Sequence, residues 1–175
     1  KKPFDRVEFR RALAGAVKKG ELVRMLGTGE EPAASWIPKG YEGWYPFRAD
    51  TEGRDVEFAG SKVESREEIR IAFDSGTRNS IAMEKVQADV KDGLGWKVRL
   101  RNLDWKALVH SINHDPEMVY RWGWSSLLQD PSGFLLAFVT GDPFNFSGFS
   151  NPKYDALVEK IVAMKPSPVR ESKIV

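Results

Sequence analysis

Apolar residues along positions 7–26 recur with the three- and four-residue spacing of one helix face. Asp5 precedes this pattern as a candidate N-cap, and Gly20 interrupts it, so we predict two short helices divided at Gly20. Residues 27–46 are rich in glycine, proline and aromatic residues, which predicts an irregular loop. Residues 48–65 are charged and interrupted by glycine, and we expect a solvated connection there.

The second half of the chain contains three candidate strands. Apolar residues alternate with other residues over 68–74 and again over 95–101, which is the period of a half-buried strand. Residues 118–124 predict a third strand. With a helix pattern between each pair, the order is strand, helix, strand, helix, strand. We therefore expect an α/β fold with a mixed, largely parallel sheet flanked by helices.

The helices between and after these strands carry capping signals. Asn79 or Ser80 can cap a helix that runs to about residue 93, and Asp104 begins a shorter one that ends near residue 112. Asn151, followed by proline, heads a final helix.

Composition and charge narrow the possible classes. The 175 residues are 41% hydrophobic and 30% charged, which is not the composition of a disordered tail or a membrane protein. The 27 basic and 25 acidic residues are interleaved, so we expect no nucleic-acid partner. The absence of cysteine excludes disulfides, thiolate metal sites and cysteine nucleophiles.

The chain begins without an initiator methionine or an apolar signal core, as expected of a piece of a longer or processed precursor.

Motifs typical of enzymes are missing from the sequence. It contains no GxGxxG, no GxxxxGK[ST] and no GxSxG. His110 and His114 stand four residues apart, with Asp115 beside them, which could place zinc ligands on one helix face. The glutamate of an HExxH motif is missing, however, and Pro116 ends any helix directly afterwards. We predict that the chain is not an enzyme and has no cofactor and no metal; a zinc enzyme using these residues is the least favoured hypothesis.

Tryptophan is abundant, and most of it lies in or beside predicted loops and strand ends. Large rings near the carboxyl ends of parallel strands line the place where open α/β sheets bind ligands, although a single tryptophan is more often part of a core. The residues concerned are Trp36, Trp44, Trp105, Trp122 and Trp124.

Four separated stretches carry motifs in a recognisable order. Residues 3–17 are PFDRVEFRRALAGAV, and residues 32–40 are PAASWIPKG. Residues 94–105 are LGWKVRLRNLDW, and GWSSLLQDPSGFL at 123–135 is followed by NPKYD at 151–155. In this order they resemble the extracytoplasmic solute-binding proteins of family 5, the oligopeptide- and dipeptide-binding proteins of ABC importers.

The resemblance implies a lobe of the type II periplasmic-binding-protein kind, within a larger protein whose two lobes close over a ligand. Residues 1–175 would form a single domain, the second lobe, and the first lobe of the same protein would be missing. The implied function is the substrate-binding component of an ABC importer. Its implied partners are a peptide or other small solute and the ABC permease subunits in the membrane. The implied location is the periplasm, or the outside of a Gram-positive cell through a lipid anchor.

The resemblance also implies ligand-binding residues. Arg121 matches an arginine that meets a peptide carboxylate in some relatives, and Asn79 lies where some relatives place a histidine for the same task. Trp105 matches the aromatic residue of a Glu-Trp pair that some members turn toward the ligand. As alternatives, Arg121 is a surface or ion-paired arginine, and Asn79 is a helix N-cap.

The remaining candidates lie in the strand-end motif and are Trp124, Ser125, Ser126 and Leu127. Trp124 is either a stacking platform or a packed anchor. Leu127 stands where peptide-binding relatives have an aspartate that holds the α-amino group of the ligand. A leucine cannot pair with an ammonium group, which favours blocked or modified peptides, saccharides or other metabolites. The competing hypothesis is an interaction or chaperone-like module that kept the fold and lost transport.

Overall fold

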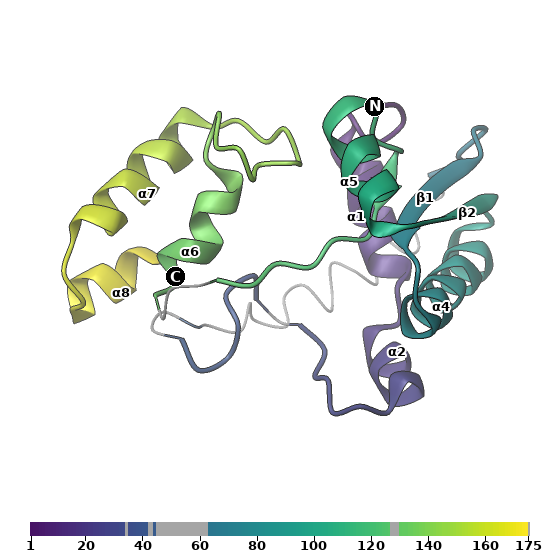
Figure 1. The fold of residues 1–175 in the computed structure, drawn as a ribbon, viewed down its shortest axis with the longest axis horizontal. Coiled ribbons are helices and arrows are strands. Elements are labelled where there is room, and N and C mark those ends of the chain that lie inside the picture. Colours follow the sequence, from purple (N-terminus) through teal and green to yellow (C-terminus); the bar gives the residue numbers. More distant parts are fainter. Residues whose placement is uncertain (34, 42–43, 45–62, 127–129, 175) are drawn as a thin grey trace. The chain divides into compact units, whose positions relative to one another are not determined.

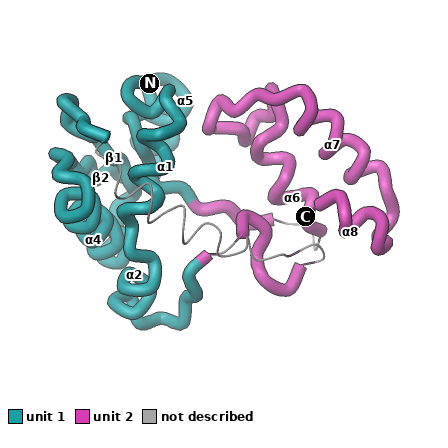
Figure 2. Tube along the Cα trace, turned by 180° about the vertical axis from the view of Figure 1, so that it is seen from behind, with its two compact units in different colours: residues 1–32, 48–122 teal, residues 33–47, 123–175 magenta. Residues whose placement is uncertain are grey.

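The chain divides into two compact units in the computed structural model (Figure 1, Figure 2), which describes residues 1–33, 35–41, 44, 63–126 and 130–174. Unit 1 comprises residues 1–32 and 48–122, and unit 2 comprises residues 33–47 and 123–175. Most of the solvated connection predicted at 48–65 lies outside the described residues. The expectation of a single lobe stays a prediction, since two compact units can belong to one lobe.

Unit 1 contains the sheet. Its strands are β1 (Ile69–Asp74), β2 (Val98–Leu103) and β3 (Val119–Tyr120), in the order β2-β1-β3. Both pairings are parallel, with Ile69 opposite Val98 and Ile71 opposite Val119. Residues on both faces of β1 are buried, as expected of a central parallel strand. The predicted α/β fold with a largely parallel sheet flanked by helices is confirmed.

The third strand is shorter than predicted. It pairs with β1 only at Val119 and Tyr120, and one further hydrogen bond runs from Arg121 N to the carbonyl oxygen of Ala72. The chain then leaves β1 and enters unit 2 at Gly123. Alternation along 118–124 cannot show where pairing stops, because this depends on the path of the neighbouring strand.

The first two helices are α1 (Val7–Ala16) and α2 (Lys19–Leu26), so the predicted break at Gly20 is wrong. The break falls at residues 17–18, where the carboxylate of Asp89 accepts the N–H of Lys18 at 3.0 Å. A carboxylate from a distant helix thus satisfies an amide at the start of α2, which the local sequence cannot reveal. The N-cap of α1 is Arg6 rather than Asp5.

The helices between the strands are α4 (Thr77–Leu94) and α5 (Trp105–His114), and α4 runs alongside β1 and β2 (Figure 1). The N-cap of α4 is Gly76, so the predicted cap at Asn79 or Ser80 is wrong; Asn79 lies inside the first turn. Asp104 is confirmed as the N-cap of α5, because its carboxylate accepts the N–H of Ala107 at 3.0 Å.

The core of unit 1 forms where α1 and α4 cover the face of β1 that carries Ile69 and Ile71. Trp96 is buried at its centre, 5.5 Å from Phe9 between ring centroids, and its indole N–H donates to Val63 O at 2.7 Å. Burying a side chain of this size stabilises the fold by about 2–3 kcal/mol. This core fixes the sheet and therefore the position of its carboxyl ends.

Unit 2 is helical in its described part. It contains α6 (Ser132–Leu135), a 3₁₀ turn (Leu136–Phe138), α7 (Pro152–Ala163) and α8 (Pro168–Ile174). The predicted helix headed by Asn151 is confirmed as α7, with the Asn151 side chain accepting the N–H of Lys153. It is not the final helix, because α8 follows, and α6 was not predicted. No helix in the described ranges of the two units has both the length and the apolar run that a bilayer crossing requires.

Candidate functional site

The carboxyl ends of the three parallel strands meet at one edge of the sheet. Strand β1 ends in Asp74, β2 is followed by Asp104 and Trp105, and Arg121 follows β3. In open α/β sheets, ligands bind outside this edge. We call the group formed by Asp74, Asn79, Trp105, Arg121 and Trp122 the carboxyl-edge cluster; all five residues belong to unit 1.

Asp74 joins two of the predicted site residues. Its Oδ1 accepts a hydrogen bond from Nη1 of Arg121 at 2.7 Å, and its Oδ2 accepts one from Nδ2 of Asn79 at 2.8 Å. The side chains of Asp74 and Arg121 are 20% and 36% exposed, so this ion pair is partly removed from water and stronger than a surface pair. Arg121 is thus an ion-paired arginine, as the structural alternative expected.

Asn79 owes its position to the start of α4. Gly76, with a φ of 156°, turns the chain directly after β1 and begins the helix. The amide of Asn79, in the first turn, then reaches back to Asp74, where it also donates to the backbone carbonyl at 3.3 Å. The side chain therefore locks the end of β1 to the start of α4.

Trp105 supplies an aromatic surface at the same edge. As the first residue of α5, it is held in place by the Asp104 cap, and it is 55% exposed. Its ring stacks on Trp122, with centroids 5.1 Å apart and an angle of 18° between the planes. Two stacked indoles present a flat apolar face on which an aliphatic or planar group can pack.

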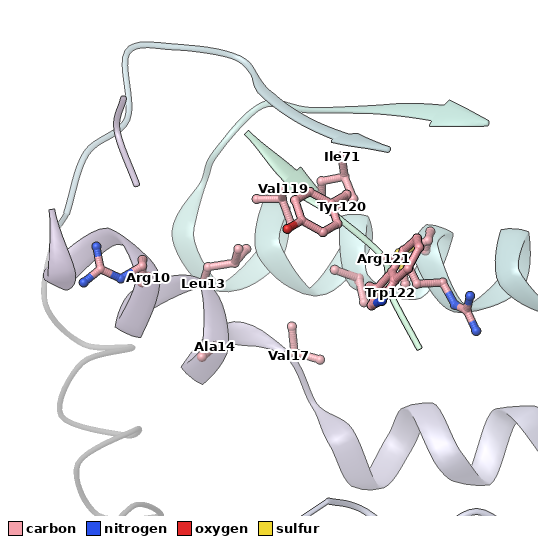
Figure 3. Close-up of a pocket in the computed structure, with 11 residues that line it drawn as sticks. Arg10, Leu13, Ala14, Val17, Ile71, Val119, Tyr120, Arg121 and Trp122 are labelled. Carbon is pink, nitrogen blue, oxygen red and sulfur yellow. The ribbon is translucent and has the colours of Figure 1, made fainter. Parts of the chain in front are cut away.

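A pocket of about 370 Å³ lies beside the edge, between α1, α4 and strands β1 and β3 (Figure 3). Most of its wall is apolar, and Arg10 and Arg121 add two cationic groups. Burial raises the pKa of the Tyr120 phenol, so this group is neutral over the whole physiological range. The other lining residues are Leu13, Ala14, Val17, Ile71, Met83, Val86, Val119 and Trp122.

Three further predicted residues lie in unit 2. The indole N–H of Trp124 donates to Gly133 O at 2.9 Å, and its ring packs edge-on against Phe144. Ser126 abuts α6 so closely that a Cβ on Gly133 would overlap its hydroxyl, while Ser125 is exposed. These contacts favour the packed-anchor interpretation of Trp124. Leu127, the fourth residue of this motif, lies outside the described residues.

Asp74 and Trp122 were absent from the predicted site. The position of Asp74, as the last residue of the first parallel strand, is the signal that could have found it. Trp122 is one of several tryptophans near strand ends, and its stacking partner cannot be read from sequence spacing.

The histidine pair on α5 forms a local contact. The rings of His110 and His114 stack with centroids 4.1 Å apart, and Nδ1 of His114 lies 2.9 Å from the carbonyl oxygen of His110. Among the described residues, no group of three or more histidine, aspartate or glutamate side chains could hold a metal ion. The zinc hypothesis therefore gains no support from the geometry.

Comparison with known proteins decides the family. Residues 1–146 match the family described as bacterial extracellular solute-binding proteins, family 5 Middle. The chain belongs to this family. The dipeptide-binding protein DppE of Bacillus subtilis is 26% identical over 90% of this chain and 32% of its own length. This family-5 chain therefore spans about a third of that relative.

Solved structures of peptide-binding proteins share the fold. The murein tripeptide binding protein MppA of Escherichia coli matches 99% of this chain with a TM-score of 0.86 at 22% identity, over 36% of its own length. The OppA of Haemophilus influenzae, solved with the peptide RPPGFSPFR, matches 99% with a TM-score of 0.85 at 19% identity, over 37% of its length. The predicted family and the type II periplasmic-binding-protein fold are confirmed.

Proposed function

We propose that this family-5 chain is the second lobe of a two-lobe solute-binding protein and supplies half of a peptide-binding cleft to an ABC importer. Relatives named for binding dipeptides, oligopeptides and murein peptides support the peptide as ligand. The chain's one-third share of DppE supports a lobe within a longer protein. In this proposal the chain catalyses no reaction and needs no cofactor, and it works outside the cytoplasmic membrane, in the periplasm or on a lipid anchor.

The observation that carries the proposal is the convergence of Asp74, Asn79 and Arg121 at the carboxyl edge of the sheet. A peptide in a closed cleft brings amide groups that need donors and acceptors, because unpaired polar groups are costly to bury. The cluster offers both kinds of group within one small area. Stacked Trp105 and Trp122 add apolar surface that accepts varied side chains without selecting one sequence.

Transport follows from closure of the two lobes. A ligand that contacts both lobes stabilises the closed form over the open one by its difference in affinity for the two forms. The closed protein then docks on the ABC permease subunits. The first lobe is therefore the partner that completes the cleft, and its movement against the second lobe produces the closed form.

The interaction or chaperone-like module remains the second hypothesis. It expects a cleft face without convergent polar groups. The bridging position of Asp74 between Asn79 and Arg121 disfavours it.

The decisive experiment uses the full-length two-lobe protein, purified from cells under native conditions. We expect mass spectrometry to detect co-purified peptides. After these are removed, we expect a mixed pool of tri- to pentapeptides to raise the melting temperature, as binding to the native state requires. Stabilisation by saccharides instead of peptides would assign another solute, and no stabilisation by either pool would favour the interaction module.

A further inference from the structure

Both side chains that the family resemblance assigned to a ligand carboxylate already donate to a carboxylate of this chain. Arg121 directs Nη1 to Asp74 Oδ1 at 2.7 Å, and Asn79 directs Nδ2 to Asp74 Oδ2 at 2.8 Å. Asp74 therefore pairs, from within the protein, with one donor of each side chain that would receive an anionic ligand group.

The positive charges near Asp74 are balanced by carboxylates of the protein itself. Asp74 and Arg121 together carry no net charge. Arg78, one residue before Asn79, is paired with Glu30.

A free carboxylate at this edge would meet two costs. It would have to displace or share the charge-assisted hydrogen bond between Arg121 and Asp74. It would also lie within a few ångströms of the Asp74 carboxylate, and like charges at that distance disfavour each other in a partly buried site. An amide meets neither cost. A guanidinium has five N–H donors, so Arg121 can hold Asp74 and donate to a ligand carbonyl, while a ligand N–H can approach the Asp74 oxygens.

We propose that Asp74 is a specificity-determining residue that neutralises Arg121, so that this edge receives an uncharged peptide amide rather than the free carboxylate at the end of a peptide. The ligands favoured are peptides blocked at the carboxyl end or long enough for an internal peptide bond to lie here. This inference rests on the peptide-binding function proposed above and adds the chemical class of peptide to it.

The test offers the full-length protein an equimolar pool of mixed-sequence tri- to pentapeptides, half with free carboxyl ends and half amidated. Mass spectrometry then measures the ratio of the two forms that the protein retains. We expect the wild type to retain amidated peptides at least as well as free acids. We expect Asp74→Asn to shift the ratio toward free acids by about tenfold, because it leaves the Arg121 charge without its counter-ion.

Asp104→Asn is the matched control, since it removes one negative charge from the same edge and keeps a side chain that caps α5. We expect it to leave the ratio within about twofold, because Asp104 is exposed and its charge is screened, and it is not paired with Arg121. A wild type that retains free acids tenfold better than amides overturns the inference and leaves peptide binding intact. An unchanged ratio in Asp74→Asn overturns it as well. If the protein retains neither the free acids nor the amides, that result contradicts the peptide-binding function itself.

Discussion

Arg170 of α8 and Asp130, two residues before α6, form an ion pair of 2.7 Å inside unit 2. The side chain of Arg170 is 3% exposed, whereas that of Asp130 is 31% exposed. The same guanidinium donates from Nε to the carbonyl oxygen of Ile161 on α7 at 3.0 Å. One buried side chain on α8 thus contacts α7 and the residue two positions before α6.

Removing the carboxylate should destabilise unit 2. We expect Asp130→Ala to lower its free energy of unfolding by about 2 kcal/mol, because a buried guanidinium loses its counter-ion. The backbone N–H of Ser132 also donates a hydrogen bond to Asp130 Oδ1, at 2.8 Å, and it loses this acceptor in the variant. Thermal unfolding measures the effect. Glu171→Gln, an exposed carboxylate on α8, is the control and should change stability little.

The same pair predicts a response to acid. The hydrogen bond from Arg170 lowers the pKa of Asp130 to about 2. Because this pKa is below that of the unfolded chain, about 3.9, the pair stabilises the folded state above pH 4 or so. That stabilisation should be lost as the pH falls from about 4 to about 2. Unfolding measured across this range should show a smaller loss in Asp130→Asn; an equal loss in both proteins would contradict the assignment.

Asp89 of α4 anchors the start of α2. It is 2% exposed, accepts the N–H of Lys18 at 3.0 Å, and pairs with the ammonium group of Lys85. We expect Asp89→Ala to cost about 2 kcal/mol, because the Lys18 N–H loses its acceptor and the Lys85 ammonium is left with Glu21 as its carboxylate partner. Asp92→Ala, which removes an exposed carboxylate from the same helix, should stay within about 0.5 kcal/mol. Urea denaturation of both variants makes the comparison.

Trp105 should matter for ligand binding more than for stability. It is 55% exposed, so Trp105→Ala should lower the free energy of unfolding by about 1 kcal/mol or less. Loss of the stack on Trp122 should weaken binding of a peptide pool about tenfold and should alter the near-ultraviolet circular dichroism of the indoles. Met25→Ala, an exposed apolar residue of α2, is the control. Unchanged peptide affinity in Trp105→Ala would remove Trp105 from the site.

Tyr154 predicts a response to alkali. Its hydroxyl donates to Leu135 O at 2.7 Å, and burial raises its pKa to about 12. The unfolded phenol ionises near pH 10, so the stabilisation from keeping Tyr154 neutral is complete below about pH 10 and is lost between about pH 10 and 12. Tyr154→Phe should remove this pH dependence and cost about 1 kcal/mol at neutral pH through the lost hydrogen bond. Absorbance of tyrosinate and thermal unfolding, followed together with pH, check both statements.

Local signals account for the predictions that were confirmed. Asp104 and Asn151 cap α5 and α7 because a short polar side chain next to a helix start needs only the nearby backbone to form its hydrogen bond. Alternation of apolar residues predicted β1 and most of β2, because this period is also a property of neighbouring positions. The cap predicted at Asn79 was wrong because the helix begins earlier, at Thr77 after Gly76, and the Asn79 amide instead donates to the carboxylate of Asp74.

The sequence by itself determined the family and the parallel α/β order, since periodicity, caps and ordered motifs are properties of neighbouring positions. Only the tertiary structure decided where α2 begins and what Arg121 binds. Those outcomes depend on Asp89 meeting Lys18 across 71 positions and Asp74 meeting Arg121 across 47. A charged group takes the partner that folding brings within reach, and the distance between two residues along the chain does not determine which partner that is.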